Sequence, residues 1–163
     1  MIVAAALVLL TGCFKRHLPK HWYEETLEYY REGFATNWSN EDRERHINVN
    51  NEQRDPDKEF GYLLVDLDGD GVDELLVGLI EPSGATKFTD VIVYHTDLGE
   101  YDLLSGCDGY YIYLCNGNVL RVDSWYGSQT EISYMTYDSS DSTFTYVTEG
   151  NYAPMRFELT PFE

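Results

Sequence analysis

Carboxylates and glycines alternate in one short stretch of the chain, Asp66-Leu67-Asp68-Gly69-Asp70-Gly71-Val72-Asp73-Glu74. Counted from Asp66, the acids Asp66, Asp68, Asp70 and Glu74 stand at positions 1, 3, 5 and 9. The glycines permit the backbone conformations that turn such side chains inward, and Val72, at position 7, offers its backbone carbonyl. An all-oxygen ligand set of this size suits Ca²⁺ better than Mg²⁺, which keeps more of its water. The stretch therefore predicts a calcium site; the alternative is an acidic turn that binds nothing.

The flanks of this stretch indicate the elements that position it. A helix-loop-helix calcium site needs a bidentate Glu at position 12, where this chain has Val77. The neighbouring apolar runs, Tyr62–Val65 and Leu75–Ile80, have the length of strands rather than helices. We therefore expect the loop to join two antiparallel strands.

The pattern Asp66-x-Asp68-x-Asp70-Gly71-x-x-Glu74-Leu75 resembles the FG-GAP type of calcium loop found in β-propeller blades of integrin α chains. It is also similar to the DxDGDGxxELL segment of many uncharacterised bacterial surface lipoproteins. The likeness covers about 20 residues. It implies a structural Ca²⁺ held by the side chains of Asp66, Asp68, Asp70 and Glu74 and by the carbonyl of Val72. Glu74 stands where Asp is commoner.

The N-terminus is typical of a targeting segment. Residues 2–10 form an unbroken apolar run, too short to span a bilayer and of the right length for a signal-peptide core. The run ends in Leu10-Thr11-Gly12-Cys13, which resembles the lipobox of bacterial lipoproteins and implies cleavage before Cys13 and lipid attachment to it. Basic residues are missing ahead of the run, and a plain secretory signal and a buried N-terminal strand are the alternatives. We expect a signal peptide at 1–12, a lipidated Cys and tether at 13–21, and one globular domain at 22–163.

The first part of this domain, residues 22–58, has a helical pattern. Tyr23, Leu27, Tyr30 and Phe34 recur at intervals of four, three and four, which places them on one helix face. Ser39 and Asp42 resemble a capping box that begins a second, shorter helix ending near residue 46. We expect the aromatic face to be core rather than a binding site.

The remaining residues, 59–163, have a β pattern throughout. Turn signals recur roughly every ten residues, as in an antiparallel meander, and the best of them is Asn116-Gly117. Segments such as 90–94 and 143–147 alternate between apolar and polar residues, which indicates one buried and one exposed face. The predicted fold is α+β and mainly β, with one or two N-terminal helices packed on an antiparallel meander of about nine strands that forms a curved sheet or open barrel.

The acidic charge is concentrated in this β part. The chain has a net charge of −18, and residues 59–163 carry 19 acidic against 3 basic residues, a net of −16. Such a surface repels phosphate backbones, so nucleic acid is excluded as a partner. With 14 tyrosines and 7 phenylalanines, the chain has ample material for a core and is not expected to be disordered.

Two cysteines remain once Cys13 is lipidated, and they form an even pair in an oxidising compartment. A Cys107–Cys115 disulfide is one expectation; two free thiols are the other. The four histidines show no zinc-hydrolase spacing, and no GxSxG motif or phosphate-binding glycine loop appears. Paired carboxylates for glycoside hydrolysis remain open, because the spatial separation of acids is not visible in a sequence.

Three functional hypotheses follow. The first is a non-catalytic protein of the bacterial cell envelope, anchored to the outer face of a membrane through lipid on Cys13, with a structural Ca²⁺ in its first β-hairpin; its partner is a glycan or another surface protein. The second is a glycan-binding module that stacks sugars on Trp125 and Tyr126, with Tyr110, Tyr111 and Tyr113 nearby. The third is an enzyme acting on polysaccharide.

Overall fold

The computed structural model describes residues 21–38, 49, 51–95, 100–105, 110–138, 140–141, 143–148 and 150–162. The expected signal peptide, Cys13, and the second helix at about 39–46 lie outside them.

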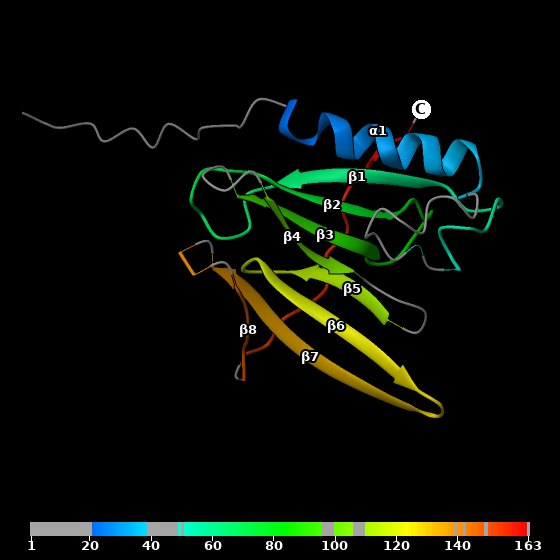
Figure 1. Ribbon diagram of the computed structural model, residues 1–163. Helices are drawn as coiled ribbons and strands as arrows, with labels where there is room; N and C mark the ends of the chain where they lie inside the picture. Colours follow the sequence, from blue (N-terminus) through cyan, green and yellow to red (C-terminus); the bar gives the residue numbers. More distant parts are fainter. Residues whose placement is uncertain are drawn as a thin grey trace, which may run out of the picture.

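One α-helix precedes nine strands within the described part of the chain. These elements are α1 (His21–Ala35), β1 (Phe60–Val65), β2 (Glu74–Leu79), β3 (Phe88–His95), β4 (Glu100–Ser105), β5 (Tyr110–Cys115), β6 (Val119–Tyr126), β7 (Gln129–Asp138), β8 (Thr143–Tyr146) and β9 (Thr160–Pro161). The strands form one open, antiparallel sheet beneath the helix (Figure 1). The predicted mainly β, α+β fold is confirmed.

The sheet departs from a simple meander at two places. The strand order is β8-β7-β6-β5-β3-β2-β1-β9, and β4 pairs with β3 beside this path. Strand β5 does not extend β4 but pairs with the start of β3, where Phe88 lies opposite Ile112. The chain end returns to the first strand, because β9 pairs with Gly61 and Tyr62 of β1. Sequential hairpins supply the other pairings.

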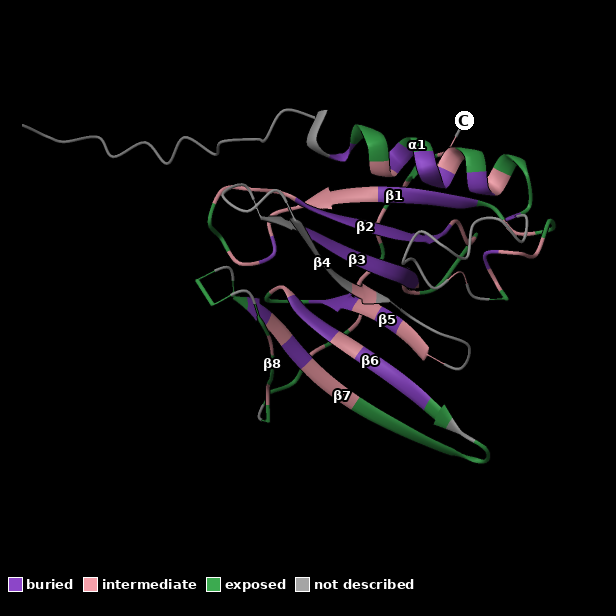
Figure 2. Cartoon of the chain, in the orientation of Figure 1, coloured by how far each residue is buried: buried purple, intermediate pink, exposed green. Residues whose placement is uncertain are grey.

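Strand β2 is the centre of the core, and all six of its residues are buried (Figure 2). Leu75 and Val77 belong to the cluster that packs with α1, whereas Leu76 belongs to a second cluster. Because successive side chains of a strand point to opposite faces, both faces of the sheet are covered at β2. This explains why residues 75–80 form a continuous apolar run.

Helix α1 covers the first face with the predicted stripe. Tyr23, Leu27 and Tyr30 are buried against β1–β3, and Phe34 packs at the edge of this cluster. The helix ends at Ala35, but Trp38 folds back against it and is 1% exposed. The backbone N–H of Trp38 donates to the carbonyl of Gly33 at 2.8 Å. A Cβ on Gly33 would lie 2.4 Å from the Trp38 ring, so only glycine fits there.

The C-terminal segment 150–162 contributes to the second core. Met155, Phe157 and Leu159 pack against the cluster that contains Leu76. The Met155 N–H donates to the Leu114 carbonyl at 2.9 Å, which ties the segment to β5. In Figure 1 this segment runs from β8 to the region beside α1. The sequence did not predict this role, because the segment has no strand periodicity of its own.

Two hairpin turns show how the register is set. Strands β5 and β6 are joined by three residues, Asn116–Asn118, and the positive φ values lie at Gly117 (74°) and Asn118 (57°). A two-residue type I′ turn at Asn116-Gly117 would need positive φ at both residues, but this loop is one residue longer and its positive φ values fall one position later. Strands β6 and β7 are joined by Gly127 and Ser128. The positive φ of 64° at Gly127 is what a type II′ turn requires.

Candidate metal site

The acidic loop spans residues 66–73 and joins β1 to β2, two strands paired directly across the hairpin from Val65 to Glu74. Strand flanks were expected, and this expectation is confirmed. Gly69 and Gly71 adopt φ values of 83° and 89°, which L side chains rarely adopt. Their N–H groups donate to the two carboxylate oxygens of Asp66, at 2.7 and 3.2 Å. The loop therefore folds around its first acid.

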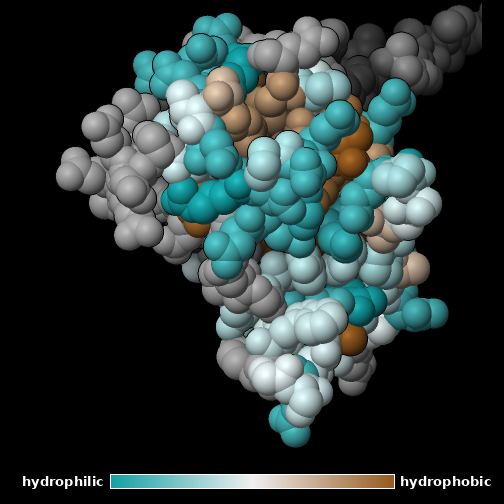
Figure 3. Space-filling view, turned by 90° about the vertical axis from the view of Figure 1, so that its right-hand side faces the viewer, coloured by the Kyte–Doolittle hydropathy of each residue, from teal (hydrophilic) through white to brown (hydrophobic). Residues whose placement is uncertain are grey.

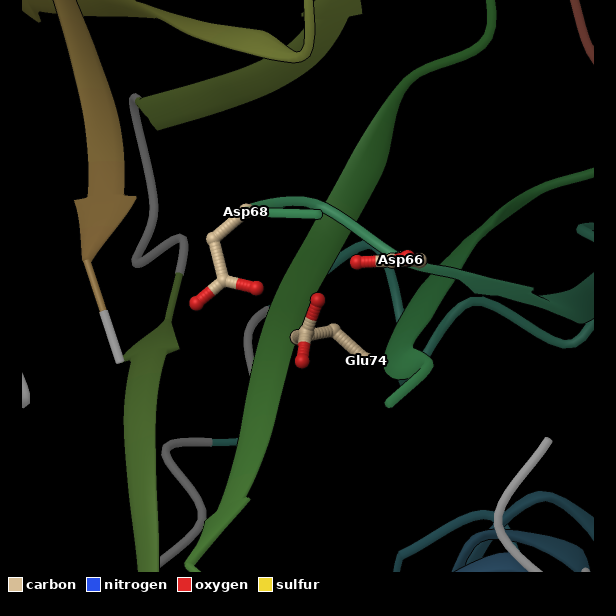
Figure 4. Close-up of side chains that lie close together, drawn as sticks. All are labelled: Asp66, Asp68 and Glu74. Atoms are coloured by element: carbon tan, nitrogen blue, oxygen red, sulfur yellow. The ribbon is translucent and has the colours of Figure 1, made fainter. Parts of the chain in front are cut away.

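Three of the predicted ligand side chains converge. Asp66, Asp68 and Glu74 each offer a carboxylate oxygen, and these atoms lie within 4.8 Å of one another. Figure 4 shows the three carboxylates turned toward a common region. Oxygens that bind one Ca²⁺ at 2.3–2.6 Å lie at most about 5 Å apart, so the spacing is suitable for a single ion.

Glu74 is the buried member of this group, with only 2% of its surface exposed. The Leu67 N–H donates to its Oε2 at 2.6 Å. The pKa of Glu74 is raised from its ordinary 4.5 to about 8. Burial is the main cause, the charges of Asp68, Asp70 and Asp66 add to it, and the Leu67 hydrogen bond opposes it. A buried carboxylate that faces other carboxylates is costly when ionised, because only a hydrogen bond opposes its desolvation.

The fourth predicted side-chain ligand, Asp70, lies differently. Asp70 is exposed and outside the group of converging oxygens; its Oδ1 accepts the Val72 N–H at 2.7 Å. Partial burial and the charges of Asp68 and Asp66 raise the pKa of Asp70. The Asp70 N–H in turn donates to Asp68 Oδ1 at 3.1 Å. Asp68 and Asp70 thus form successive Asx turns, and Asp66 accepts N–H groups from further along the same loop.

Two distant residues brace the loop, and sequence analysis missed both. The hydroxyl of Tyr23, in α1, donates to the carbonyl of Asp73 at 2.9 Å. The side-chain amide of Asn118, in the β5–β6 turn, donates to the carbonyl of Asp66 at 2.9 Å. No local signal identifies these contacts, because they join residues about 50 positions apart.

The remaining candidate residues lie elsewhere. Cys107 lies outside the described residues, so the disulfide with Cys115 stays a prediction; Cys115 itself is buried, and burial raises the pKa of its thiol. Trp125 is 54% exposed on β6, with its ring edge-on to Tyr111 at a centroid distance of 6.3 Å. Tyr126 is the last residue of β6, and its side chain is outside the described part.

Within the described residues, no helix has both the length and the apolar character needed to cross a membrane. Comparison of the chain with protein-family models, with curated proteins and with solved structures finds no significant match.

Proposed function

We propose that this chain is a non-catalytic, lipid-anchored protein of the bacterial cell surface whose β1–β2 loop binds a structural Ca²⁺. The observation that carries the calcium proposal is the convergence of Asp66 and Asp68 on Glu74, a carboxylate that is 2% exposed. Three acidic oxygens within 4.8 Å of one another repel, and a divalent cation converts that repulsion into attraction. A ligand set of carboxylate oxygens, with the Val72 carbonyl as the predicted fifth ligand, suits Ca²⁺ better than Mg²⁺, which keeps several of its waters.

The role of the ion follows from the position of the loop. It connects β1 to β2, and β2 is buried on both faces of the sheet. An ion that ties Asp66 and Asp68 to Glu74 joins the two strands where the hairpin opens into the loop. Binding of the ion therefore stabilises the centre of the fold. This role is structural and involves no reaction.

The envelope location rests on sequence alone. The apolar run at residues 2–10, followed by Leu10-Thr11-Gly12-Cys13, supports cleavage before Cys13 and lipidation of its thiol. Lipid on Cys13 then supplies the membrane attachment, and an extracytoplasmic location supplies millimolar Ca²⁺, at which even a weak site is filled.

Thermal unfolding of the full chain in EDTA and in excess Ca²⁺ tests the calcium proposal. At about a hundredfold excess over the dissociation constant, an ion that binds only the folded state adds about 2.7 kcal/mol. For a chain of this size the midpoint should rise by roughly 5 °C or more. The variant Asp68→Asn keeps the acceptor for the Asp70 N–H and removes a ligand charge, so it should lose most of this shift.

The matched control is Asp138→Asn. Asp138 is an exposed Asx-turn acid outside the loop, with Oδ1 accepting the Ser140 N–H at 2.9 Å. This variant should keep the full shift. Equal midpoints in EDTA and Ca²⁺ for the unaltered chain would show that the loop is only an acidic turn.

Labelling with a radioactive fatty acid tests the anchor separately. Bacteria that express the full chain should incorporate the label into it, and Cys13→Ser should abolish incorporation while Cys115→Ser retains it. Label retained in Cys13→Ser would contradict lipidation at this residue.

A further inference from the structure

The far end of the β6–β7 hairpin carries an exposed aromatic and aliphatic surface that the proposed calcium site does not explain. Residues 129–132 of β7 are all exposed, and the ends of β6 and β7 are green in Figure 2, beyond the purple core strands. Trp125 is 54% exposed and Ile132 is 46% exposed. They are two of only three large hydrophobic residues that are exposed in the described part of the chain.

The register places these side chains on one face of the sheet. Asp123 of β6 lies opposite both Tyr111 of β5 and Ile132 of β7. Directly opposed residues share a face, as do residues two apart in a strand, so Trp125 is on this face too. Arg121 and Tyr113 form the next pair along it. We call these six residues, Tyr111, Tyr113, Arg121, Asp123, Trp125 and Ile132, the Trp125 face.

Polar groups of fixed geometry lie among the rings. Arg121 Nε and Nη2 donate to the two oxygens of Asp123 at 2.6 and 2.8 Å, a bidentate pair whose side chains are 24% and 12% exposed. The Arg121 guanidinium also lies over the ring of Tyr113, 5.6 Å from its centroid. A guanidinium carries five N–H donors, and the pair with Asp123 is locally neutral. The face thus combines apolar ring surface with planar hydrogen-bonding groups.

We propose that the Trp125 face binds a neutral glycan chain. Sugar rings present C–H faces, which stack on the negative face of an aromatic ring, and hydroxyls, which pair with planar carboxylate and guanidinium groups. The surrounding β part has a net charge of −16, so a neutral ligand is accepted where an anionic polymer is repelled. A cationic partner is disfavoured locally, because Arg121 and Lys87 already lie over the rings of Tyr113 and Tyr111.

The size of the apolar surface also favours a glycan over a protein partner or a second copy of the chain. Trp125 and Ile132, each about half exposed, offer on the order of 200 Å² of apolar surface. A stable protein interface buries about 800 Å² on each side. In Figure 3 the lower part of the molecule is mostly pale, the colour of intermediate hydropathy, with a single brown patch rather than a continuous hydrophobic area.

Titration calorimetry of the full chain with neutral hexasaccharides of glucose, mannose, galactose and N-acetylglucosamine tests the proposal. At least one should bind, and Trp125→Ala should weaken it by about tenfold or more. Trp125→Phe keeps a ring for stacking and should retain most of the affinity. The control Tyr146→Ala removes an aromatic residue that is 70% exposed on β8 and should leave binding unchanged.

Three binding results would overturn the proposal. They are no binding across the neutral panel, equal binding by Trp125→Ala, and polygalacturonate bound as tightly as the neutral chains. Sedimentation that reveals a dimer dispersed by Trp125→Ala would assign the face to a second copy instead. The hairpin end and the acidic loop point in different directions in Figure 1, so failure of this proposal leaves the calcium proposal standing.

Discussion

Replacing Glu74 by Gln separates the cost of its buried charge from its value as a metal ligand. Gln preserves the size of the side chain and an oxygen that accepts the Leu67 N–H, but it has no charge. Without calcium, the natural chain should be less stable to unfolding than the Glu74→Gln variant. With calcium, the same substitution removes a ligand charge. The variant should therefore be more stable than the natural chain in EDTA and respond less to calcium.

The magnitude follows from the pKa of Glu74, which is 4.5 ordinarily and about 8 in the folded chain. At pH 7 the unfolded chain has this group ionised, whereas the metal-free folded chain must take up a proton. That uptake costs about 3 kcal/mol at 1.36 kcal/mol per pH unit. Because Gln needs no proton, Glu74→Gln should raise the EDTA midpoint by roughly 6 to 12 °C.

Calorimetric melts of the natural chain and of Glu74→Gln at pH 7, each in EDTA and in excess Ca²⁺, measure both the midpoint without metal and the shift caused by calcium. The control Glu131→Gln makes the same chemical change at an exposed position of β7 and should alter neither midpoint. A lower EDTA midpoint for Glu74→Gln would refute the inference that Glu74 is a buried carboxylate without a compensating charge. An undiminished calcium shift would refute its role as a ligand.

Three further predictions concern stability. In EDTA, the free energy of unfolding measured with urea should fall as the pH rises from about 4.5 through 8. The reason is that the raised pKa of Glu74 favours the folded state only while this group is protonated. Saturating calcium should remove this pH dependence. Gly33→Ala places a Cβ 2.4 Å from the Trp38 ring. Overpacking should lower the free energy of unfolding by about 1–3 kcal/mol, partly offset by about 1 kcal/mol from the better helix propensity of Ala. An unchanged urea midpoint would contradict the close packing. Asn118→Ala removes the donor to the Asp66 carbonyl and should lower the free energy of unfolding by about 1 kcal/mol. Calorimetry should also show weaker calcium binding, although no ligand is altered. Unaltered calcium affinity would show that this hydrogen bond is dispensable for the site.

The elements that sequence analysis predicted well depend on neighbours in the chain. The stripe of Tyr23, Leu27 and Tyr30 follows from the helical repeat, and all three are buried. The strands on each side of the acidic loop follow from short apolar runs bounded by glycine and aspartate. The hydrogen bonds inside the acidic loop are equally local, because the carboxylates of Asp66 and Asp68 accept N–H groups two to five residues later.

Features that depend on the path of the chain through space were not predicted from the sequence. The positive φ at Asn118 depends on the length of the β5–β6 loop, which the Cys115–Val119 pairing sets. Trp38 is buried although it lies beyond the end of α1, because the chain turns back over Gly33. The second core requires the segment 150–162, whose residues have no periodicity that indicates which face they cover.

The sequence by itself determined which residue types lie in the acidic loop, that strands flank it, and that the chain is mainly β with one aromatic helix face. Only the tertiary structure decided that Glu74 is buried, that Asp70 lies outside the group of converging oxygens, and that Tyr23 and Asn118 hold the loop. The reason is physical: spacing along a chain sets local hydrogen bonds and periodicity, whereas burial and the pKa of a carboxylate depend on which distant elements pack around it.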